Sequence, residues 1–136
     1  MSFKWDVEKN CMQIKGQITH LTPGYHGFHI HELGDLQNGC ISTGGHYNPA
    51  KVDHAGPTNS TQHIGDLGNI LAYQDGIAFV DICVDFVHTI GEQSVIGRAV
   101  VVHAGPDDLG SVGDVGSKKT GNAGGRVGCG VIGVAR

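Results

Sequence analysis

Histidines at short spacings are the residues of this sequence with the clearest chemistry. The segment His29-Ile30-His31 places two histidines two positions apart. Side chains alternate along a β-strand, so both imidazoles would point to one side and could bind the same metal ion. By itself the pair is a weak signal, because two polar positions on a half-buried strand have the same spacing.

Further candidate ligands strengthen this interpretation. Three histidines and a carboxylate follow along the chain, at His46, His54, His63 and Asp66. His103 ends a strongly apolar segment, where an imidazole without a partner would be costly. Imidazole nitrogens with one carboxylate suit copper and zinc, whereas calcium prefers oxygen ligands. Six histidines exceed one tetrahedral site, so the sequence predicts two metals.

The elements that must position these ligands are strands. Alternating apolar and polar residues predict strands over Ser2–Glu8, Met12–Thr19, Gly27–Glu32, Leu67–Tyr73, Ile77–Phe86, Ile96–His103 and Val127–Val134. No segment of ten or more residues has a helical period. The pattern favours an all-β fold, either a sandwich or a barrel. Two long connections, Leu33–Gly65 and Ala104–Gly125, lack strand character, and we expect them to be functional loops.

Composition and charge limit the function classes. The chain of 136 residues, 23 of them glycine, predicts one domain over 1–136 that is rich in turns. A formal net charge of −4 disfavours a nucleic-acid binder. No apolar run reaches the roughly 18 residues of a membrane span. The first residues have no apolar signal-peptide region, so we expect a cytoplasmic protein without nucleic-acid or membrane partners.

The four cysteines have no Cys-x-x-Cys spacing, which excludes a thioredoxin motif and a zinc ribbon. Their number alone leaves the oxidation state open.

Two long segments resemble the signatures of the copper/zinc superoxide dismutase family. They are Gly24–Glu32 (GYHGFHIHE) and Gly121–Ile132 (GNAGGRVGCGVI), and His63–Asn69 between them resembles the end of the family's zinc loop. The resemblance runs from about Ile14 to Arg136. Because both signatures are long and occur in order, the chain is identified as a member of this family.

The resemblance implies a role for each candidate residue. Copper would be bound by His29, His31, His46 and His103, and zinc by His46, His54, His63 and Asp66. His46 would therefore be shared by both metals. Asp107 would link copper-side and zinc-side histidines, and Cys40 and Cys129 would form a disulfide. Arg126 would attract the anionic substrate, and Thr120 would narrow the channel. We expect the other two cysteines, Cys11 and Cys83, to be free thiols.

The implied activity is disproportionation of superoxide to dioxygen and hydrogen peroxide. A redox-cycling copper would exchange one electron with each superoxide, while a structural zinc stays redox-silent. Because the whole chain is negative, local positive charge must guide the anion, and Arg126, Lys118 and Lys119 are the candidates. The implied partners are a second copy of the chain, through a face near Gly34, Ile96, Gly97 and Val134, and a copper chaperone that loads the metal.

The implied fold is a Greek-key β-barrel or sandwich of the immunoglobulin-like type. Compared with the family, the N-terminus is shortened and lacks the first strand, which predicts an unpaired sheet edge. Two other function classes would need features that this sequence does not have. A non-catalytic metal-binding module of this fold would lose copper ligands or add a Cys-x-Cys tail, and this chain does neither. A zinc hydrolase would need an open zinc position with a general base, whereas the implied zinc site is closed by four protein ligands.

Overall fold

The computed structural model describes residues 1–136, and β-strands dominate it. The strands are β1 (Ser2–Asp6), β2 (Cys11–Ile18), β3 (Gly24–His31), β4 (Gln37–Cys40), β5 (Asp66–Ala72), β6 (Ala78–Val84), β7 (Ala99–His103) and β8 (Arg126–Val131). A 3-10 turn spans Ile41–Thr43, and the helix α1 spans Val115–Thr120. Every strand predicted from alternation has a counterpart. The elements β4 and α1 were not predicted, because four and six residues are too few to show a period.

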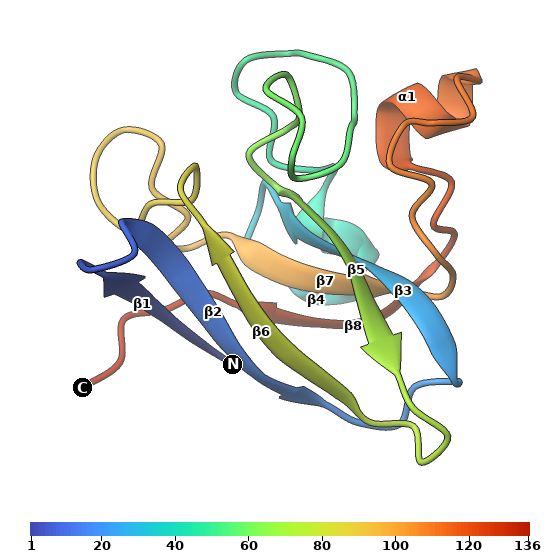
Figure 1. The fold of residues 1–136 in the computed structure, drawn as a ribbon, viewed down its shortest axis with the longest axis horizontal. Helices are drawn as coiled ribbons and strands as arrows, with labels where there is room; N and C mark the ends of the chain where they lie inside the picture. Colours follow the sequence, from blue (N-terminus) through green and yellow to red (C-terminus); the bar gives the residue numbers. More distant parts are fainter.

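All the strands except β4 form one curled antiparallel sheet in the order β1-β2-β6-β5-β3-β7-β8 (Figure 1). After β6 the chain returns to place β7 beside β3, so four strands lie in the order β6-β5-β3-β7, which is a Greek-key arrangement. The predicted all-β Greek-key fold is therefore confirmed. β1 pairs only with β2 and β8 only with β7, so these two strands form the edges of the sheet.

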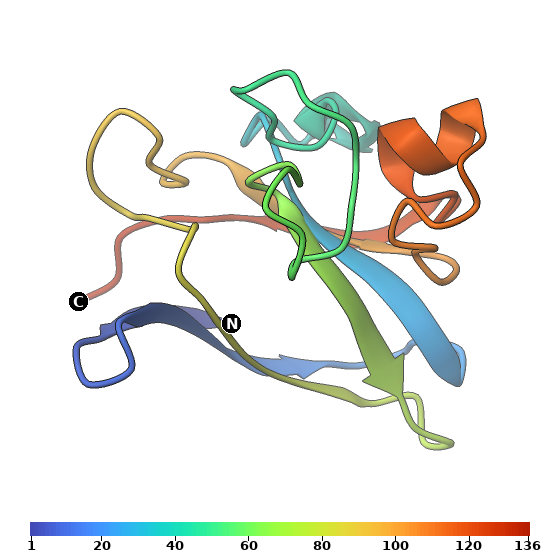
Figure 2. The same ribbon diagram turned by 45° about the horizontal axis from the view of Figure 1, so that its top comes forward.

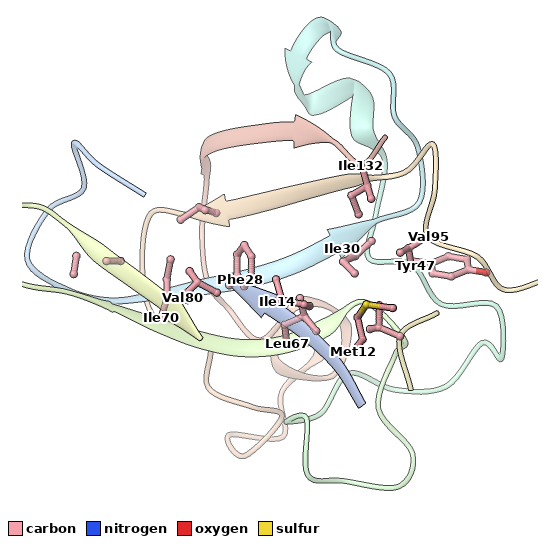
Figure 3. Close-up of a cluster of buried hydrophobic side chains, with 14 residues drawn as sticks. Met12, Ile14, Phe28, Ile30, Tyr47, Leu67, Ile70, Val80, Val95 and Ile132 are labelled. Atoms are coloured by element: carbon pink, nitrogen blue, oxygen red, sulfur yellow. The ribbon is translucent and has the colours of Figure 1, made fainter. Parts of the chain in front are cut away.

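The hydrophobic core lies inside the curl of the sheet (Figure 3). Phe28 and Ile30 of β3 are fully buried there, together with Ile14 of β2. Because side chains alternate along a strand, the residues between and after them, His29 and His31, point to the outer face of the sheet. The core thus fixes the direction of the two histidines whose spacing first suggested a metal site.

The first long connection leaves the end of β3, and the second begins beside the first half of β3, where Gly27 N donates to the Gly105 carbonyl over 2.9 Å (Figures 1 and 2). They contact each other directly, since the His54 backbone N–H donates to the Lys118 carbonyl over 2.7 Å. Asp114 caps the first turn of α1 by accepting from the Ser117 N–H. The structure contains no helix long and apolar enough to cross a membrane.

All four cysteines are paired, so the prediction of free thiols at Cys11 and Cys83 is wrong. Cys83 lies opposite Gln13 in the β2–β6 register. Cys11, two residues before Gln13, is therefore on the same face as Cys83, with 5.5 Å between the two Cα atoms. The second disulfide joins Cys40 and Cys129, as the resemblance implied, and it ties the first long connection to β8.

Candidate metal centre

The two histidines of β3 are buried on the outer face of the sheet beneath the loops. His31 Nδ1 lies 2.9 Å from the Gly44 carbonyl, to which it donates, so its Nε2 carries the free lone pair. His29 has the opposite arrangement. Its Nε2 donates to Asp107 Oδ2 over 2.7 Å, and its Nδ1 is left free. Each imidazole is held in place by one nitrogen and presents the other as a potential ligand.

His103, at the end of β7, brings a third imidazole to the same point. Its Nδ1 donates to the Gly124 carbonyl over 3.0 Å. Its Nε2 lies 3.3 Å from His31 Nε2, a contact between two lone pairs unless a cation or a proton lies between them. The pairing of β3 with β7 explains this contact, because the two strands are neighbours in the sheet.

His46 reaches the site from the first long connection. Its neighbour Tyr47 donates a backbone hydrogen bond to Ile30 O over 2.8 Å and accepts one from Gly65 N over 3.0 Å. A Cβ atom on Gly65 would collide with the Ile30 carbonyl, so only glycine allows this close approach. The backbone therefore fastens His46 against β3.

Asp66, the first residue of β5, contacts the histidines of the first long connection. Its Oδ1 lies 3.0 Å from His46 Nδ1, 2.9 Å from His54 Nδ1 and 3.2 Å from His63 Nδ1. Its Oδ2 accepts from the backbone N–H groups of Ala55 and His63. The outer nitrogens of the two loop histidines are also engaged: His54 Nε2 donates to Asp107 Oδ1 over 2.7 Å, and His63 Nε2 donates to the Val52 carbonyl over 2.9 Å.

These ligand atoms form two groups, each compact enough to hold one metal ion. The first comprises His29, His31, His46 and His103, and the second comprises His29, His46, His54 and Asp66. Where the resemblance implied His63 for the second site, the compact group has His29. His63 still lies beside it, with its Nδ1 3.4 Å from His46 Nδ1. His46 belongs to both groups, with Nδ1 on the Asp66 side.

The donor set fits a metal, because buried ligand atoms lack hydrogen bonds. His29 Nδ1, His46 Nε2 and His54 Nδ1 have no hydrogen-bond partner. The 2.9 Å contact between His54 Nδ1 and Asp66 Oδ1 does not have hydrogen-bonding geometry. An unpaired buried polar atom costs about 1–3 kcal/mol, and a bound cation would remove that cost.

Burial adjusts the histidines for metal binding. Desolvation lowers the pKa of His29 to about 3 and that of His31 to about 2. Both are therefore neutral at pH 7, as ligands must be. Burial also tends to lower the pKa of His54, but the adjoining carboxylates of Asp107 and Asp66 outweigh it and raise the pKa to about 9. A cation beside Asp66 would replace the proton that His54 otherwise holds there.

An open hollow leads to the first group. It has a volume of about 340 Å³, and its lining includes His46, His103, Thr120 and Arg126. A neighbouring hollow of about 510 Å³ shares His46 and Thr120 and adds Lys118 and Lys119. The predicted positive residues thus line the approach to the histidines. Arg126 Nη1 donates to the Cys40 carbonyl over 2.7 Å, so the Cys40–Cys129 disulfide also anchors the guanidinium group.

The structure brings every sequence-predicted site residue to this centre. What the sequence reasoning missed are the groups that hold the ligands: the carbonyls of Gly44, Val52 and Gly124, and the buried hydroxyl of Thr43. Backbone carbonyls have no signal in residue type. Gly44 and Gly124 have positive φ, so only their glycine identity could have indicated special backbone there.

A curled Greek-key sheet with two adjoining histidine-rich ligand groups defines an all-β protein built to hold two metal ions. Residues 2–132 match the family model described as copper/zinc superoxide dismutase. The chain thus belongs to the copper/zinc superoxide dismutase family, its metals are copper and zinc, and its activity is the disproportionation of superoxide.

Individual relatives agree with this assignment. The chain is 57% identical over 121 residues to "Superoxide dismutase [Cu-Zn] 2" of Mesembryanthemum crystallinum, which covers 89% of this chain and 78% of that protein. It is 53% identical over 131 residues to the "Extracellular superoxide dismutase [Cu-Zn]" of Brugia pahangi, which covers 94% of this chain but 66% of that protein. The crystal structure of the clock protein EA4 superposes with a TM-score of 0.92 at 46% identity, and the match covers 98% of this chain and 84% of that chain.

Proposed function

We propose that the ligand atoms divide between the two metals as the resemblance implied. Copper is held by His29, His31, His46 and His103, and zinc by His46, His54, His63 and Asp66. One observation supports this division above the others. Five of these histidines use one ring nitrogen to donate to a carbonyl or carboxylate that belongs to neither ligand group. In His46, by contrast, both nitrogens lie inside the ligand groups. His46 is therefore the histidine suited to be shared.

When bound, copper supplies one-electron exchange with superoxide, and zinc supplies a fixed positive charge without redox chemistry. Residues of the chain hold the proton and position the ligands. His46 Nε2 would be free to take a proton whenever no metal is bound to it, because no group of the chain hydrogen-bonds to it. With a metal on the zinc side, His46 Nδ1 and Asp66 Oδ1, which lie 3.0 Å apart, would both belong to its ligand group and would hold the ring from that side.

Loss of single ligands tests the division. His103→Ala removes a ligand of the copper group alone, and His63→Ala removes one of the zinc side alone. Metal analysis after loading should show selective loss of copper in the first variant and weaker zinc retention in the second. Far-UV circular dichroism should show that both variants keep the sheet. A fully active His103→Ala protein would overturn the copper assignment.

Arg126 is proposed to guide superoxide into the hollow. Its guanidinium is held only by neutral oxygens, those of Cys40, Ile41 and Thr43, so no carboxylate neutralises its charge. Thr120 lines the same hollow and limits its width. Replacing Arg126 by Gln should lower the rate and flatten its dependence on ionic strength. An unchanged salt profile would contradict this role, and Arg136→Gln, at the C-terminus, is the charge-matched control.

A homodimer is proposed through the apolar surface around Gly97. Gly34 packs against the Gly97 carbonyl, and Ile96, Val131 and Val134 are exposed around them. Sedimentation velocity should report a dimer that Ile96→Glu dissociates. A monomeric wild-type chain at micromolar concentration would contradict the proposal.

Delivery of copper by a chaperone is also proposed, supported by the deep burial of all four copper-side histidines. Copper uptake from a copper-loaded chaperone should then be faster than uptake from a soluble chelate at equal free copper.

The cytoplasmic location stays a prediction. It would place two disulfides in a reducing compartment, against the usual rule, and subcellular fractionation tests it.

A further inference from the structure

The hydroxyl of Thr43 joins two side chains of the centre. Thr43 ends the 3-10 turn Ile41–Thr43 and is fully buried. Its Oγ1 donates to the Cys40 carbonyl over 2.6 Å. Because the single hydroxyl proton is used there, both lone pairs are available to accept. One accepts from Arg126 Nη1 at 3.0 Å, and the other faces the Nδ1–H of His31 at 3.2 Å.

We propose that Thr43 is a positioning residue that fixes Arg126 relative to the His31 imidazole and thereby sets how tightly the copper side binds an anion. The proposal rests on the proposed roles of Arg126 and His31. Thr43 does not itself line the hollow, so it acts through the groups that it holds.

The other contacts of Arg126 show why this hydroxyl matters. They are two backbone carbonyls of the same turn, Cys40 O at 2.7 Å and Ile41 O at 3.3 Å. Thr43 Oγ1 is the only side-chain oxygen that accepts a hydrogen bond from the guanidinium. Of the three oxygens that contact Arg126, it is also the one that contacts a ligand histidine. Since a hydroxyl is neutral, it orients the guanidinium without cancelling the charge that an anion needs.

A threonine at this position could instead serve only the turn, through its bond to the Cys40 carbonyl. The two roles predict different results. A turn residue would change stability and leave anion binding as it was. A positioning residue would change anion binding, and the change would depend on the presence of Arg126.

The test uses azide as an anionic probe of the copper- and zinc-loaded protein, with binding followed by the absorbance of the copper site. Thr43→Val keeps the shape and removes the hydroxyl, so we expect azide to bind roughly 3–10-fold more weakly, a loss of the size of one typical hydrogen bond. Thr43→Ser keeps the hydroxyl and should restore the affinity to within about twofold. If Thr43→Val does not retain copper, Thr43→Ala replaces it with the same expectation.

Two further variants make the result specific. In an Arg126→Gln background, Thr43→Val should leave azide affinity unchanged, because the group that it positions is gone. Ser42→Ala removes a hydroxyl of the same turn, which accepts from Asn38 N and does not contact Arg126. This variant should therefore bind azide with the affinity of the wild type. Wild-type affinity in Thr43→Val, or an equal loss in Ser42→Ala, would overturn the inference. If Arg126→Gln alone fails to weaken azide, the proposed role of Arg126 fails instead.

Discussion

At the scale of single residues, Asp107 joins the two halves of the centre. Its two oxygens accept from His29 Nε2 and His54 Nε2, both at 2.7 Å, and its backbone N–H donates to Asn69. Hydrogen bonding to both histidines outweighs its burial and lowers the pKa of Asp107 to about 2. The carboxylate therefore stays ionised and keeps a proton on Nε2 of both rings, so that Nδ1 is the nitrogen that faces the ligand groups.

Asp107→Asn should weaken metal binding while it preserves the shape of the side chain. The amide NH2 group would face a histidine N–H, so one ring must turn or change tautomer. Loss of such a supporting partner typically costs 10–100-fold in metal affinity. Competition with a chelator measures the affinity. Asp85→Asn, which changes an exposed carboxylate outside the centre, should bind metals like the wild type. Equal affinities in both variants would contradict the bridging role.

The buried histidines also make the metal-free chain sensitive to acid. The pKa values of His29 and His31 lie near 3 and 2, against about 6.5 in the unfolded chain. Between these limits the unfolded state binds protons that the folded state does not, so stability falls as pH falls below about 6.5. Urea unfolding in a chelator should show a midpoint that decreases from pH 6.5 to 4. A midpoint that is constant or rises over this range would contradict the effect.

At the scale of elements, the strands follow from the sequence and the loops do not. Alternation places Phe28 in the core, so it also predicts the outward direction of His29. The conformation of the long connections depends on tertiary contacts instead. The bond from His54 N to Lys118 O joins residues that no local pattern relates. The ligand types could therefore be read from the sequence with the help of the family resemblance, but the carbonyls that hold them could not.

Gly121, at the end of α1, connects the second loop to the centre. Its φ is +72°, and an added Cβ atom would collide with Asp107 Oδ1 and lie 2.5 Å from His54 Nε2. Gly121→Ala should therefore lower both stability and zinc affinity. Gly113→Ala is a matched control, because its φ is +82° and a Cβ atom there meets open space. The control should lose only the roughly 1–2 kcal/mol of backbone strain. Equal zinc affinity in the two variants would show that Gly121 does not support Asp107.

At the scale of the whole molecule, two disulfides close long loops for different purposes. Cys11–Cys83 spans 72 residues between β2 and β6, and Cys40–Cys129 spans 89 residues and anchors the Arg126 turn. Replacing either pair by serine should lower the free energy of unfolding by about 2–4 kcal/mol. Only loss of Cys40–Cys129 should also reduce activity per bound copper. Free cysteines found by thiol counting under denaturing, non-reducing conditions would contradict the pairing. The sequence predicted free thiols at Cys11 and Cys83 instead, because these two residues become neighbours only through strand register.

Net charge is the other property of the whole chain that bears on its activity. A formal charge of −4 repels an anionic substrate over most of the surface. Lys118, Lys119 and Arg126 line the hollows over the ligand groups and so provide local attraction where it is needed.

The most direct test of the central claim is metal content and superoxide disproportionation measured on one sample, before and after copper loading. The arrangement of the two ligand groups predicts one copper and one zinc per chain, with activity that rises in proportion to bound copper. A chain that takes up both metals and still fails to disproportionate superoxide would contradict the account.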